Sequence, residues 1–298
     1  MTARAYAKVN VRLSVGPPRA DGFHDLVNVF HAVSLFDEVT VRPAGRLSVA
    51  VHGRAADQVP DGEDNLAARA ALLLAERTGV APAVELAVHK AIPVAGGMAG
   101  GSADAAAALV ACDALWGTGL GRAELHALAA ELGSDVPFAL LGGTAIGYGR
   151  GEVLTPVPAR GPFHWVFALA HGGLSTPAVY AECDRLRAAA GVPAAAPVPD
   201  DKLMDALATG DALAVGARLV NDLQDAALSL RPDLAATLAA GRAEDGVLGA
   251  LVSGSGPTCA FLVESAERAD AVAESLRTSG TCAGTVRADG PAPGTGLA

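Results

Sequence analysis

The chain has 298 residues, 51% of them hydrophobic, and a formal net charge of −10 at neutral pH. This length allows two domains with a sizeable core, and the acidic balance argues against a general nucleic-acid or anionic-membrane binder. The four cysteines are widely spaced, which is typical of free thiols and not of a zinc site. The amino terminus lacks the apolar core of a secretory signal, and no apolar run is long enough to span a bilayer, so we expect a cytoplasmic protein.

A strand is expected over residues 5–15, because polar and apolar residues alternate along much of it. The alternation places Lys8, Asn10 and Arg12 on one face. Such a face is usually solvated, so the pattern alone leaves a ligand-binding role open. A turn-rich segment follows, and residues 26–42 are strand-like in two parts around Ser34.

A helix is expected over residues 61–77, where an apolar stripe recurs at helical spacing. Asp64 is the predicted N-cap, and Asn65 falls at the helix start. A strand over 83–88 then leads to Lys90 and into a glycine-rich loop.

Residues 93–101 contain four glycines, and the alanine-rich stretch after them predicts a helix that begins near Ser102 as its N-cap and reaches Trp116. A glycine loop before a helix start frees backbone N–H groups and adds partial positive charge, which favours a phosphate site. A flexible turn before a buried helix is the alternative. The loop is not a P-loop, because neither Lys-Ser nor Lys-Thr follows its last glycine.

Asp135 follows a predicted helix over 122–132 and precedes Pro137, so its local pattern favours a helix cap. A proline-rich break near residues 155–162 predicts a domain boundary. The later expected strands are 144–148, 165–170, 249–252, 260–263 and 285–288, and the later expected helices are 176–187, 202–207, 211–219, 232–240 and 266–275. Their irregular order is typical of the α+β class.

We therefore expect an amino-terminal domain over residues 1–155 and a carboxy-terminal domain over 156–288. The last residues, 289–298, read GPAPGTGLA after Asp289 and predict a flexible tail. A second glycine loop, residues 253–257, lies between two expected strands of the carboxy-terminal domain.

Three separated segments together resemble the GHMP kinases, which include galactokinase and the homoserine, mevalonate and phosphomevalonate kinases. They are AYAKVNVRL from Ala5, PVAGGMAGGSADAA from Pro93 and VSGSGPTCAF from Val252. Within that superfamily, AKVNVRLSVGPPRADGFHDL and LGSDVPFAL are similar to signatures of the 4-diphosphocytidyl-2-C-methyl-D-erythritol kinase family. EDNLAARAALLL, STPAVY and NDLQDA also occur in the family's order, so the resemblance covers residues 5 to about 263.

The resemblance implies an α+β, two-domain GHMP kinase fold, with a ribosomal-protein-S5-like amino-terminal domain, a ferredoxin-like carboxy-terminal domain and the active site between them. It also implies transfer of the γ-phosphate of ATP to the 2-hydroxyl of 4-diphosphocytidyl-2-C-methyl-D-erythritol, in the non-mevalonate isoprenoid pathway. ATP with Mg²⁺ and this small molecule are the expected ligands, and no residue is assigned to the metal. Two alternatives stay open: another GHMP kinase, of the homoserine or mevalonate type, and a catalytically inactive nucleotide-binding sensor.

By the same resemblance, Asp135 corresponds to the catalytic base and Lys8 to the catalytic lysine that would orient the hydroxyl. Asn10 corresponds to a substrate contact. The glycine loop is expected to hold the ATP phosphates, and Asn65 and Lys90 to lie near the adenine. The full set of expected ATP-binding residues is Asn65, Lys90, Pro93, Val94, Ala95, Gly96, Gly97, Met98, Ala99, Gly100, Gly101, Ser102 and Ala103.

The cytidine end of the substrate is expected to meet Phe23 and Tyr180, which correspond to two aromatic residues on either side of the cytosine. His24 corresponds to the reader of the cytosine edge, and Thr176 to a contact with the methylerythritol part. The second glycine loop is expected to close the carboxy-terminal side of the cleft, by contact or by support.

The chain departs from the family's glycine loop at three positions. Ala95 and Ala99 replace glycines, which reduces the backbone freedom of the loop, and Ala103 lacks a hydroxyl. Phosphate contacts from the backbone survive such changes. Phe23 replaces the more common tyrosine, which removes a hydroxyl and leaves stacking intact.

Overall fold

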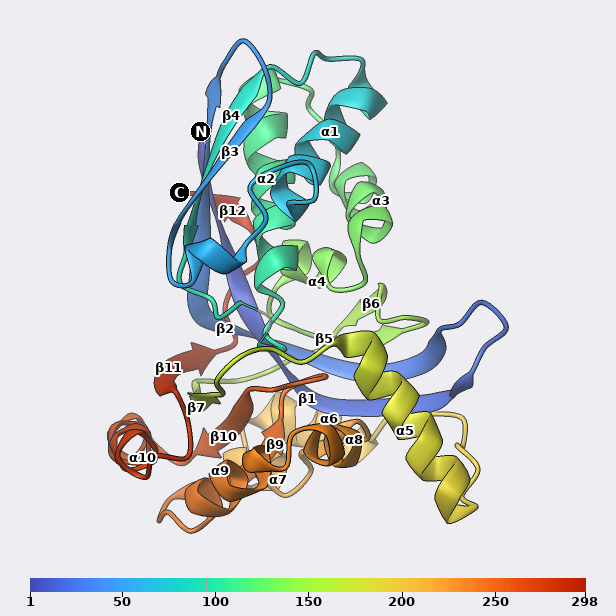
Figure 1. Ribbon diagram of the computed structural model, residues 1–298, viewed down its shortest axis with the longest axis vertical. Helices are drawn as coiled ribbons and strands as arrows, with labels where there is room; N and C mark the ends of the chain where they lie inside the picture. The colour runs from blue at the N-terminus through green and yellow to red at the C-terminus, as the bar shows by residue number, and fades with distance from the viewer. Residues whose placement is uncertain (95) are drawn as a thin grey trace.

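Two β-sheets organise the molecule, one in each half (Figure 1). The computed structural model describes residues 1–94 and 96–298, so the predicted role of Ala95 lies outside the described residues. The segment that joins the two sheets, residues 157–162, falls within the predicted proline-rich break. Within the described part of the chain, no helix is both long and apolar enough to cross a membrane.

The amino-terminal sheet has the strand order β12-β1-β2-β4-β3, with β5 and β6 continuing from β2 and β8 pairing with β1. Its strands are β1 (Thr2–Pro18), β2 (His24–Pro43), β3 (Ser48–Gly53), β4 (Val84–Lys90), β5 (Thr144–Tyr148), β6 (Val153–Pro156), β8 (Val220–Asn221) and β12 (Gly296–Leu297). The helical segments of this half are η1 (Ala56–Gln58), α1 (Leu66–Thr78), α2 (Gly100–Trp116), α3 (Arg122–Leu132) and α4 (Val136–Leu141). Helix α2 packs against β1 and β2 on one side and against α1 on the other.

Helix α2 is buried around much of its circumference because it is built largely from alanine, whose small side chain allows close packing. The helix begins at Gly100, with Ala99 as its N-cap, so the prediction of Ser102 as the cap is wrong. Asp64 is also not the cap of α1. Asn65 takes that position, and its Oδ1 accepts a hydrogen bond from the Ala67 N–H at 2.8 Å.

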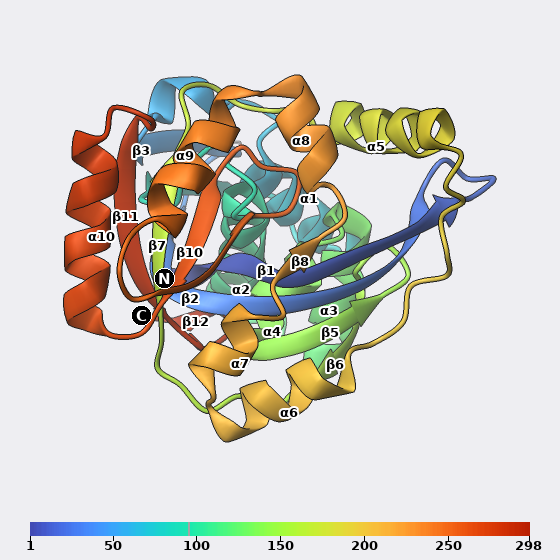
Figure 2. The same ribbon diagram turned by 90° about the horizontal axis from the view of Figure 1, so that it is seen from below.

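The carboxy-terminal sheet is antiparallel, with the strand order β11-β7-β10-β9. The order of elements along the chain is that of a ferredoxin-like unit, with further helices between β7 and β9. The elements are β7 (Phe163–Leu169), α5 (Thr176–Ala190), α6 (Asp201–Thr209), α7 (Ala212–Gly216), α8 (Gln224–Leu230), α9 (Asp233–Arg242), β9 (Val247–Val252), β10 (Cys259–Val263), α10 (Ala266–Thr278) and β11 (Gly284–Gly290). Helices α9 and α10 cover the face that points away from the amino-terminal half (Figure 2).

Strand β1 does not keep one alternation along its length. Its pairing with β2 shifts between Asn10 and Arg12, so Val11 is an extra residue that reverses the faces beyond it. Leu13, and not Arg12, therefore faces the cleft with Lys8 and Asn10. The predicted shared face of Lys8, Asn10 and Arg12 is wrong at Arg12. A second shift, in β2 opposite Tyr6, matches the predicted interruption near Ser34.

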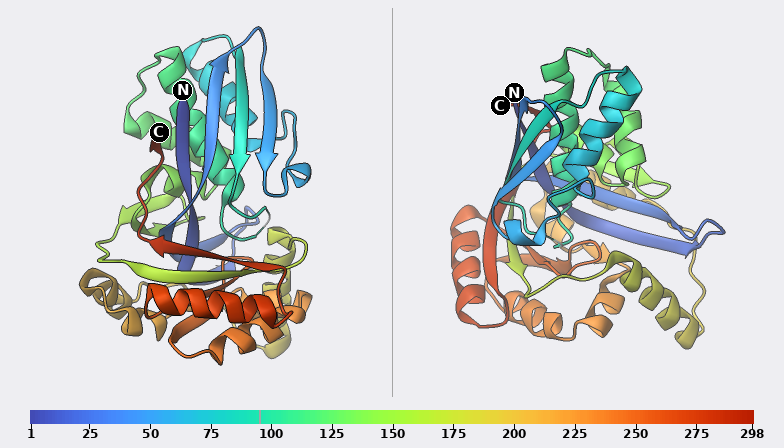
Figure 3. Two further views of the ribbon diagram at one scale, coloured as in Figure 1. Left: turned by 90° about the vertical axis from the view of Figure 1, so that its left-hand side faces the viewer. Right: turned by 45° about the horizontal axis from the view of Figure 1, so that its top comes forward.

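The prediction of a flexible tail over 289–298 is wrong, because Asp289 and Gly290 end β11 and the residues after them return to the amino-terminal sheet. Gly296 and Leu297 pair with β1, so the two chain ends lie close together (Figure 3). The Ala292 N–H donates to the Ala32 carbonyl oxygen at 2.9 Å, and the Thr295 N–H donates to Ala139 at 3.1 Å. These bonds involve the backbone, which explains why a composition of glycine and proline does not reveal them.

Candidate active site

A cleft of about 760 Å³ lies between the two halves of the molecule. The amino-terminal half lines it with β1, the turn before β2, the start of α2 and the residues before α4. The carboxy-terminal half contributes α5 and the loop between β9 and β10. The cleft therefore collects segments that are far apart in the sequence.

Lys8 and Asp135 face each other in this cleft, with Nζ and Oδ2 3.6 Å apart. The Lys8 side chain is 6% exposed and that of Asp135 is 32% exposed, so the carboxylate is the more accessible partner. Lys8 donates to Asn10 Oδ1 at 2.6 Å, and Asn10 Nδ2 donates to Asn28 Oδ1 at 2.8 Å. Burial lowers the pKa of Lys8, while the charge of Asp135 opposes that shift. This chain of contacts holds the ammonium beside the carboxylate.

Asp135 occupies the N-cap position of α4, but its side chain accepts no cap hydrogen bond from any described residue. A cap would bond the N–H of the second or third helical residue, and the second is Pro137, which has none. The local interpretation of Asp135 as a side-chain cap is therefore wrong. Its carboxylate is left facing the cleft.

The glycine loop and the first turn of α2 form one wall of the cleft. The lining residues of this wall are Gly96, Gly97, Ala99, Gly100, Gly101 and Ser102. The other predicted loop residues that the structure describes, Pro93, Val94, Met98 and Ala103, are not among the lining residues. Met98 has a buried side chain and accepts the Lys8 N–H with its carbonyl oxygen at 3.2 Å. The loop thus supports the strand that carries Lys8.

Lys90 and Asn65 lie behind this wall, and neither is among the described residues that line the cleft. The Lys90 ammonium is buried between Asp37 and Asp104, and donates to both carboxylates. The buried Asn65 side chain is used by the α1 cap and by the Pro60 carbonyl oxygen. Both residues make structural contacts in the protein, and their place near the adenine stays a prediction.

The opposite end of the cleft is aromatic. The Phe23 ring is 46% exposed, and the Arg150 guanidinium carbon lies 5.0 Å from its centroid. The buried His24 ring packs against Tyr180, with centroids 5.1 Å apart and planes tilted by 35°. Thr176 lies at the start of α5 and shares a hydrogen bond of 2.8 Å with the Ser255 hydroxyl. Of these six residues only His24, at the start of β2, belongs to a strand, and the others lie on α5 or in turns and loops.

Comparison with known proteins shows the same architecture and related sequences. The model of the GHMP kinases N terminal domain matches residues 65–143, and that of the GHMP kinases C terminal matches residues 203–282. The 4-diphosphocytidyl-2-C-methyl-D-erythritol kinase of Thermobifida fusca is 62% identical, over 99% of this chain and 97% of its own. That of Streptomyces avermitilis is 61% identical, over 99% and 98%. The chain belongs to the 4-diphosphocytidyl-2-C-methyl-D-erythritol kinase family.

A crystal structure of a 4-(cytidine 5'-diphospho)-2C-methyl-D-erythritol kinase agrees with this family assignment. It matches with a TM-score of 0.78 and 34% identity, over 97% of this chain and 98% of that one. Family membership and the two-domain α+β fold, both expected from the sequence motifs, are confirmed.

Among the charged and amide side chains that line the cleft of this kinase, sequence reasoning missed Asn28, Arg150 and Asp184. Asp184 had a detectable signal, because it lies four residues after Tyr180 and so shares its face of α5. Asn28 and Arg150 depend on the pairing of β1 with β2 and on the turn after β5, which spacing along the chain does not reveal.

Proposed function

We propose that this chain, a kinase of the 4-diphosphocytidyl-2-C-methyl-D-erythritol kinase family, phosphorylates the 2-hydroxyl of 4-diphosphocytidyl-2-C-methyl-D-erythritol with ATP. The observation that carries the proposal is the position of the Lys8–Asp135 pair. It lies in the same cleft as a glycine loop and an aromatic cluster, so one pocket offers a phosphate site, a base and a ring site. The product would be a precursor of isoprenoids.

The glycine loop is the proposed site of the ATP phosphates. The N–H groups of the first residues of a helix have no partner within the helix, and those of α2 begin at Gly100 on the cleft wall. Together with the helix dipole they favour a phosphate anion. ATP is expected as its Mg²⁺ complex, and the described residues hold no cluster of three or more acidic, histidine or cysteine side chains for a resident metal.

Asp135 is the proposed general base. Its carboxylate would take the proton of the 2-hydroxyl as the oxygen attacks the γ-phosphorus. The bond between that phosphorus and the β,γ-bridging oxygen breaks, and ADP leaves. Lys8 would orient the hydroxyl and offset the negative charge of the transferred group, from a buried position where a charge acts strongly.

Phe23 and Tyr180 would stack on the cytosine, since aromatic rings offer the flat apolar surface that a base requires. His24 would read the edge of the base, and Thr176 would contact the methylerythritol part. Homoserine and mevalonate carry no nucleobase, so a kinase for either needs a base site only for the adenine of ATP. The aromatic end of the cleft therefore favours the cytidyl substrate over these alternatives.

The test is a substrate panel with purified protein, Mg²⁺ and ATP. We expect ADP release with the cytidyl substrate, and a kcat/KM at least about 1,000-fold above those for homoserine and mevalonate, because a site with unfilled polar groups rejects smaller ligands strongly. Phosphorus NMR of the product should show a new phosphate monoester. Comparable turnover of homoserine or mevalonate would contradict the substrate assignment, and ATP binding without ADP release would support a nucleotide sensor.

A further inference from the structure

We infer that Asp184 is a positioning residue that sets the base preference of the cleft through His24. It holds the imidazole proton on Nε2 and leaves Nδ1 as a hydrogen-bond acceptor. An acceptor at this point selects a pyrimidine that presents an amino group over one that presents a carbonyl oxygen. The inference rests on the proposed function, because it assumes that a pyrimidine binds beside His24.

The contact between His24 and Asp184 is symmetric. His24 Nε2 lies 3.1 Å from each carboxylate oxygen of Asp184, a residue of α5. The His24 side chain is 6% exposed, and that of Asp184 is 34% exposed. A carboxylate accepts hydrogen bonds and donates none, so the nitrogen that faces it must carry the proton.

Tyr180 restrains the same imidazole on its face. It lies one helical turn before Asp184 on α5, and its ring packs against that of His24. A ring flip of His24 would replace Nε2 with a carbon in front of the carboxylate and lose the hydrogen bond. Helix α5 therefore fixes both the plane of the imidazole and its orientation within that plane.

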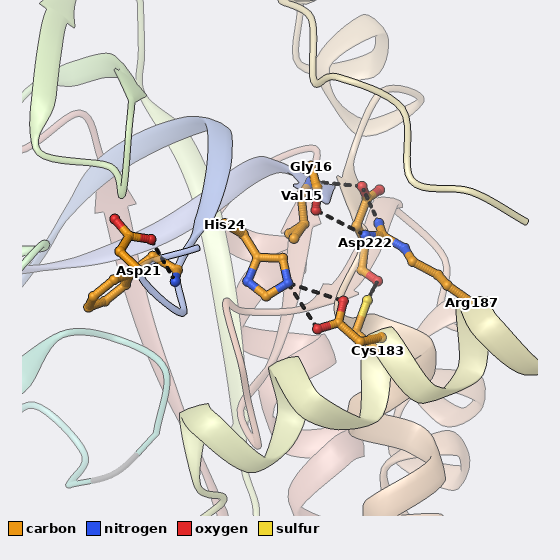
Figure 4. A network of polar contacts seen from close by, with 9 residues as sticks. Val15, Gly16, Asp21, His24, Cys183, Arg187 and Asp222 are labelled. Carbon is orange, nitrogen blue, oxygen red and sulfur yellow. Dashed lines mark hydrogen bonds and ion pairs between the residues drawn. The ribbon is translucent and has the colours of Figure 1, made fainter. Parts of the chain in front are cut away.

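A second set of contacts fixes α5 against the end of β1. Asp222 Oδ2 accepts from the Val15 N–H at 2.9 Å and from Arg187 Nη2 at 3.2 Å, and Arg187 also donates to the Gly16 carbonyl oxygen at 3.4 Å (Figure 4). Two arginines follow Asp184 on α5: Arg185, the next residue, pairs with Glu182 at 2.7 Å, and Arg187 lies three residues after Asp184. Because Arg187 is engaged by Asp222, it leaves the Asp184 carboxylate to the histidine.

Nδ1 of His24 is then the free edge of the ring. It has no hydrogen-bond partner among the described residues, and the His24 ring belongs to the lining of the cleft. With the proton on Nε2, the lone pair of Nδ1 accepts from the amino group of cytosine and repels the corresponding carbonyl oxygen of uracil. Sites that read a base by such a bond discriminate more strongly than apolar pockets.

The experiment combines NMR of the imidazole with kinetics. Nitrogen-15 shifts of His24 in labelled protein, at about pH 8.5 where a free imidazole is neutral, report which nitrogen carries the proton. We expect a proton on Nε2 in the native protein and a mixture of tautomers in Asp184→Asn, because the amide can accept from Nε2 or donate to it. Asp205→Asn, an exposed carboxylate on α6, is the matched control and should leave the tautomer unchanged.

Kinetics then compare the cytidine and uridine forms of the methylerythritol substrate. The native protein should prefer the cytidine form by at least about 100-fold. Asp184→Asn should narrow that ratio by at least about tenfold, which is the effect of roughly one hydrogen bond. The change should come through the KM of the cytidine form, with the KM for ATP within about twofold of native. A change in the KM of the cytidine form without a change in the KM for ATP separates a positioning role of Asp184 from a general loss of structure.

Two outcomes distinguish a failure of the proposed function from a failure of the inference on Asp184. If the native protein phosphorylates neither substrate, the proposed function is wrong. If it phosphorylates the cytidine form and Asp184→Asn keeps the native base ratio or the native tautomer, this inference alone is wrong.

Discussion

Ser253 donates a hydrogen bond from its hydroxyl to the carbonyl oxygen of Gly97, with 3.1 Å between the oxygens. The two residues belong to the two glycine loops and are 156 positions apart in the sequence. A Cβ added at Gly97 would lie only 2.2 Å from the Ser253 carbonyl oxygen. The loops of the two halves therefore meet backbone to backbone beside the cleft, which explains why this position has glycine.

Gly97→Ala should separate these loops. Gly97 has a φ of +73°, so alanine would add backbone strain to the steric clash. We expect the free energy of unfolding to fall by about 1–3 kcal/mol and the KM for ATP to rise by at least about tenfold, a cost of roughly 1.4 kcal/mol in binding. Urea unfolding and ADP release at varied ATP measure the two effects.

Ser253→Ala is the control for Gly97→Ala, because it removes one hydrogen bond and keeps the backbone approach. It should cost about 1 kcal/mol of stability. A Gly97→Ala protein with native stability and a native KM for ATP would show that the close approach does not matter.

Ala99→Gly should stabilise the protein. Ala99 caps α2 with φ 62° and ψ 32°, the left-handed region that disfavours residues with a Cβ. Glycine relieves this strain but adds freedom to the unfolded chain, so we expect a net gain of about 0.5–1 kcal/mol in the free energy of unfolding. Ala103→Gly, inside the same helix, should instead lose about 1 kcal/mol. A lower urea midpoint for Ala99→Gly would contradict the strain argument.

The motifs predicted more of the site than of the structure that supports it. Lys8 and Asp135, expected to act together, share one cleft with the aromatic residues Phe23 and Tyr180. These positions lie in contiguous strings, so a short segment is enough to find them. The sequence does not reveal the bulge at Val11, because whether a strand gains a residue is decided by its pairing partner.

Lys90 shows that the sequence also does not reveal the distant partners of a buried charge. Its partners Asp37 and Asp104 lie 53 and 14 positions away, so the resemblance, which implied a place near the adenine, gave no sign of this buried ion pair. The tail after Asp289 was missed for a related reason. Its order depends on backbone hydrogen bonds to distant strands, and composition does not encode these.

The two carboxylates around Lys90 should differ in importance. Asp37 accepts from Lys90 and from the N–H groups of Ala91 and Ile92 at 2.6 and 2.8 Å, whereas Asp104 bonds only Lys90 among the described residues. Asp37→Asn should lower the free energy of unfolding by about 3–5 kcal/mol, as expected when a buried charge loses its partner. Asp104→Asn should change the free energy of unfolding by about 1 kcal/mol or less at neutral pH. The reason is that the raised pKa of Asp104 leaves this group largely protonated, and so uncharged, at that pH.

The pH dependence of stability is a second measurement that distinguishes Asp104 from Asp37. Burial raises the pKa of Asp104 from 3.8 to about 8, although the Lys90 ammonium opposes the shift. The folded state thus holds a proton that the unfolded state releases, so this residue's contribution to stability falls as pH rises from 3.8 through about 8. Asp104→Asn should remove that slope in urea midpoints. Equal losses of stability in Asp37→Asn and Asp104→Asn would contradict the different importance of the two carboxylates.

His31 should make the protein sensitive to acid. Its buried ring lies 5.5 Å from that of Phe163 and 6.3 Å from that of Trp165, and Nδ1 bonds the Thr144 hydroxyl at 2.8 Å. Burial lowers the pKa of His31 from 6.5 to about 3. Below pH 6.5 the unfolded state binds the proton and the folded state does not, so stability falls, by about 2 kcal/mol at about pH 5.

Urea midpoints between about pH 7 and pH 5 test this sensitivity. His31→Gln should lose about 2 kcal/mol less than the native protein over that range, and His52→Gln, exposed at the end of β3, should behave like the native protein. A native-like acid response of His31→Gln would show that another group is responsible.

Single-turnover phosphorylation by Asp135→Asn is the sharpest test of Asp135 as the general base, because this variant keeps the shape of the side chain and removes its charge. The cytidyl substrate and ATP are mixed with excess enzyme, and the transfer rate is measured apart from ATP binding. We expect a transfer rate about 100 to 10,000 times slower than native, with an ATP affinity within about threefold of native. A transfer rate within about tenfold of native would contradict the role of Asp135 as the base.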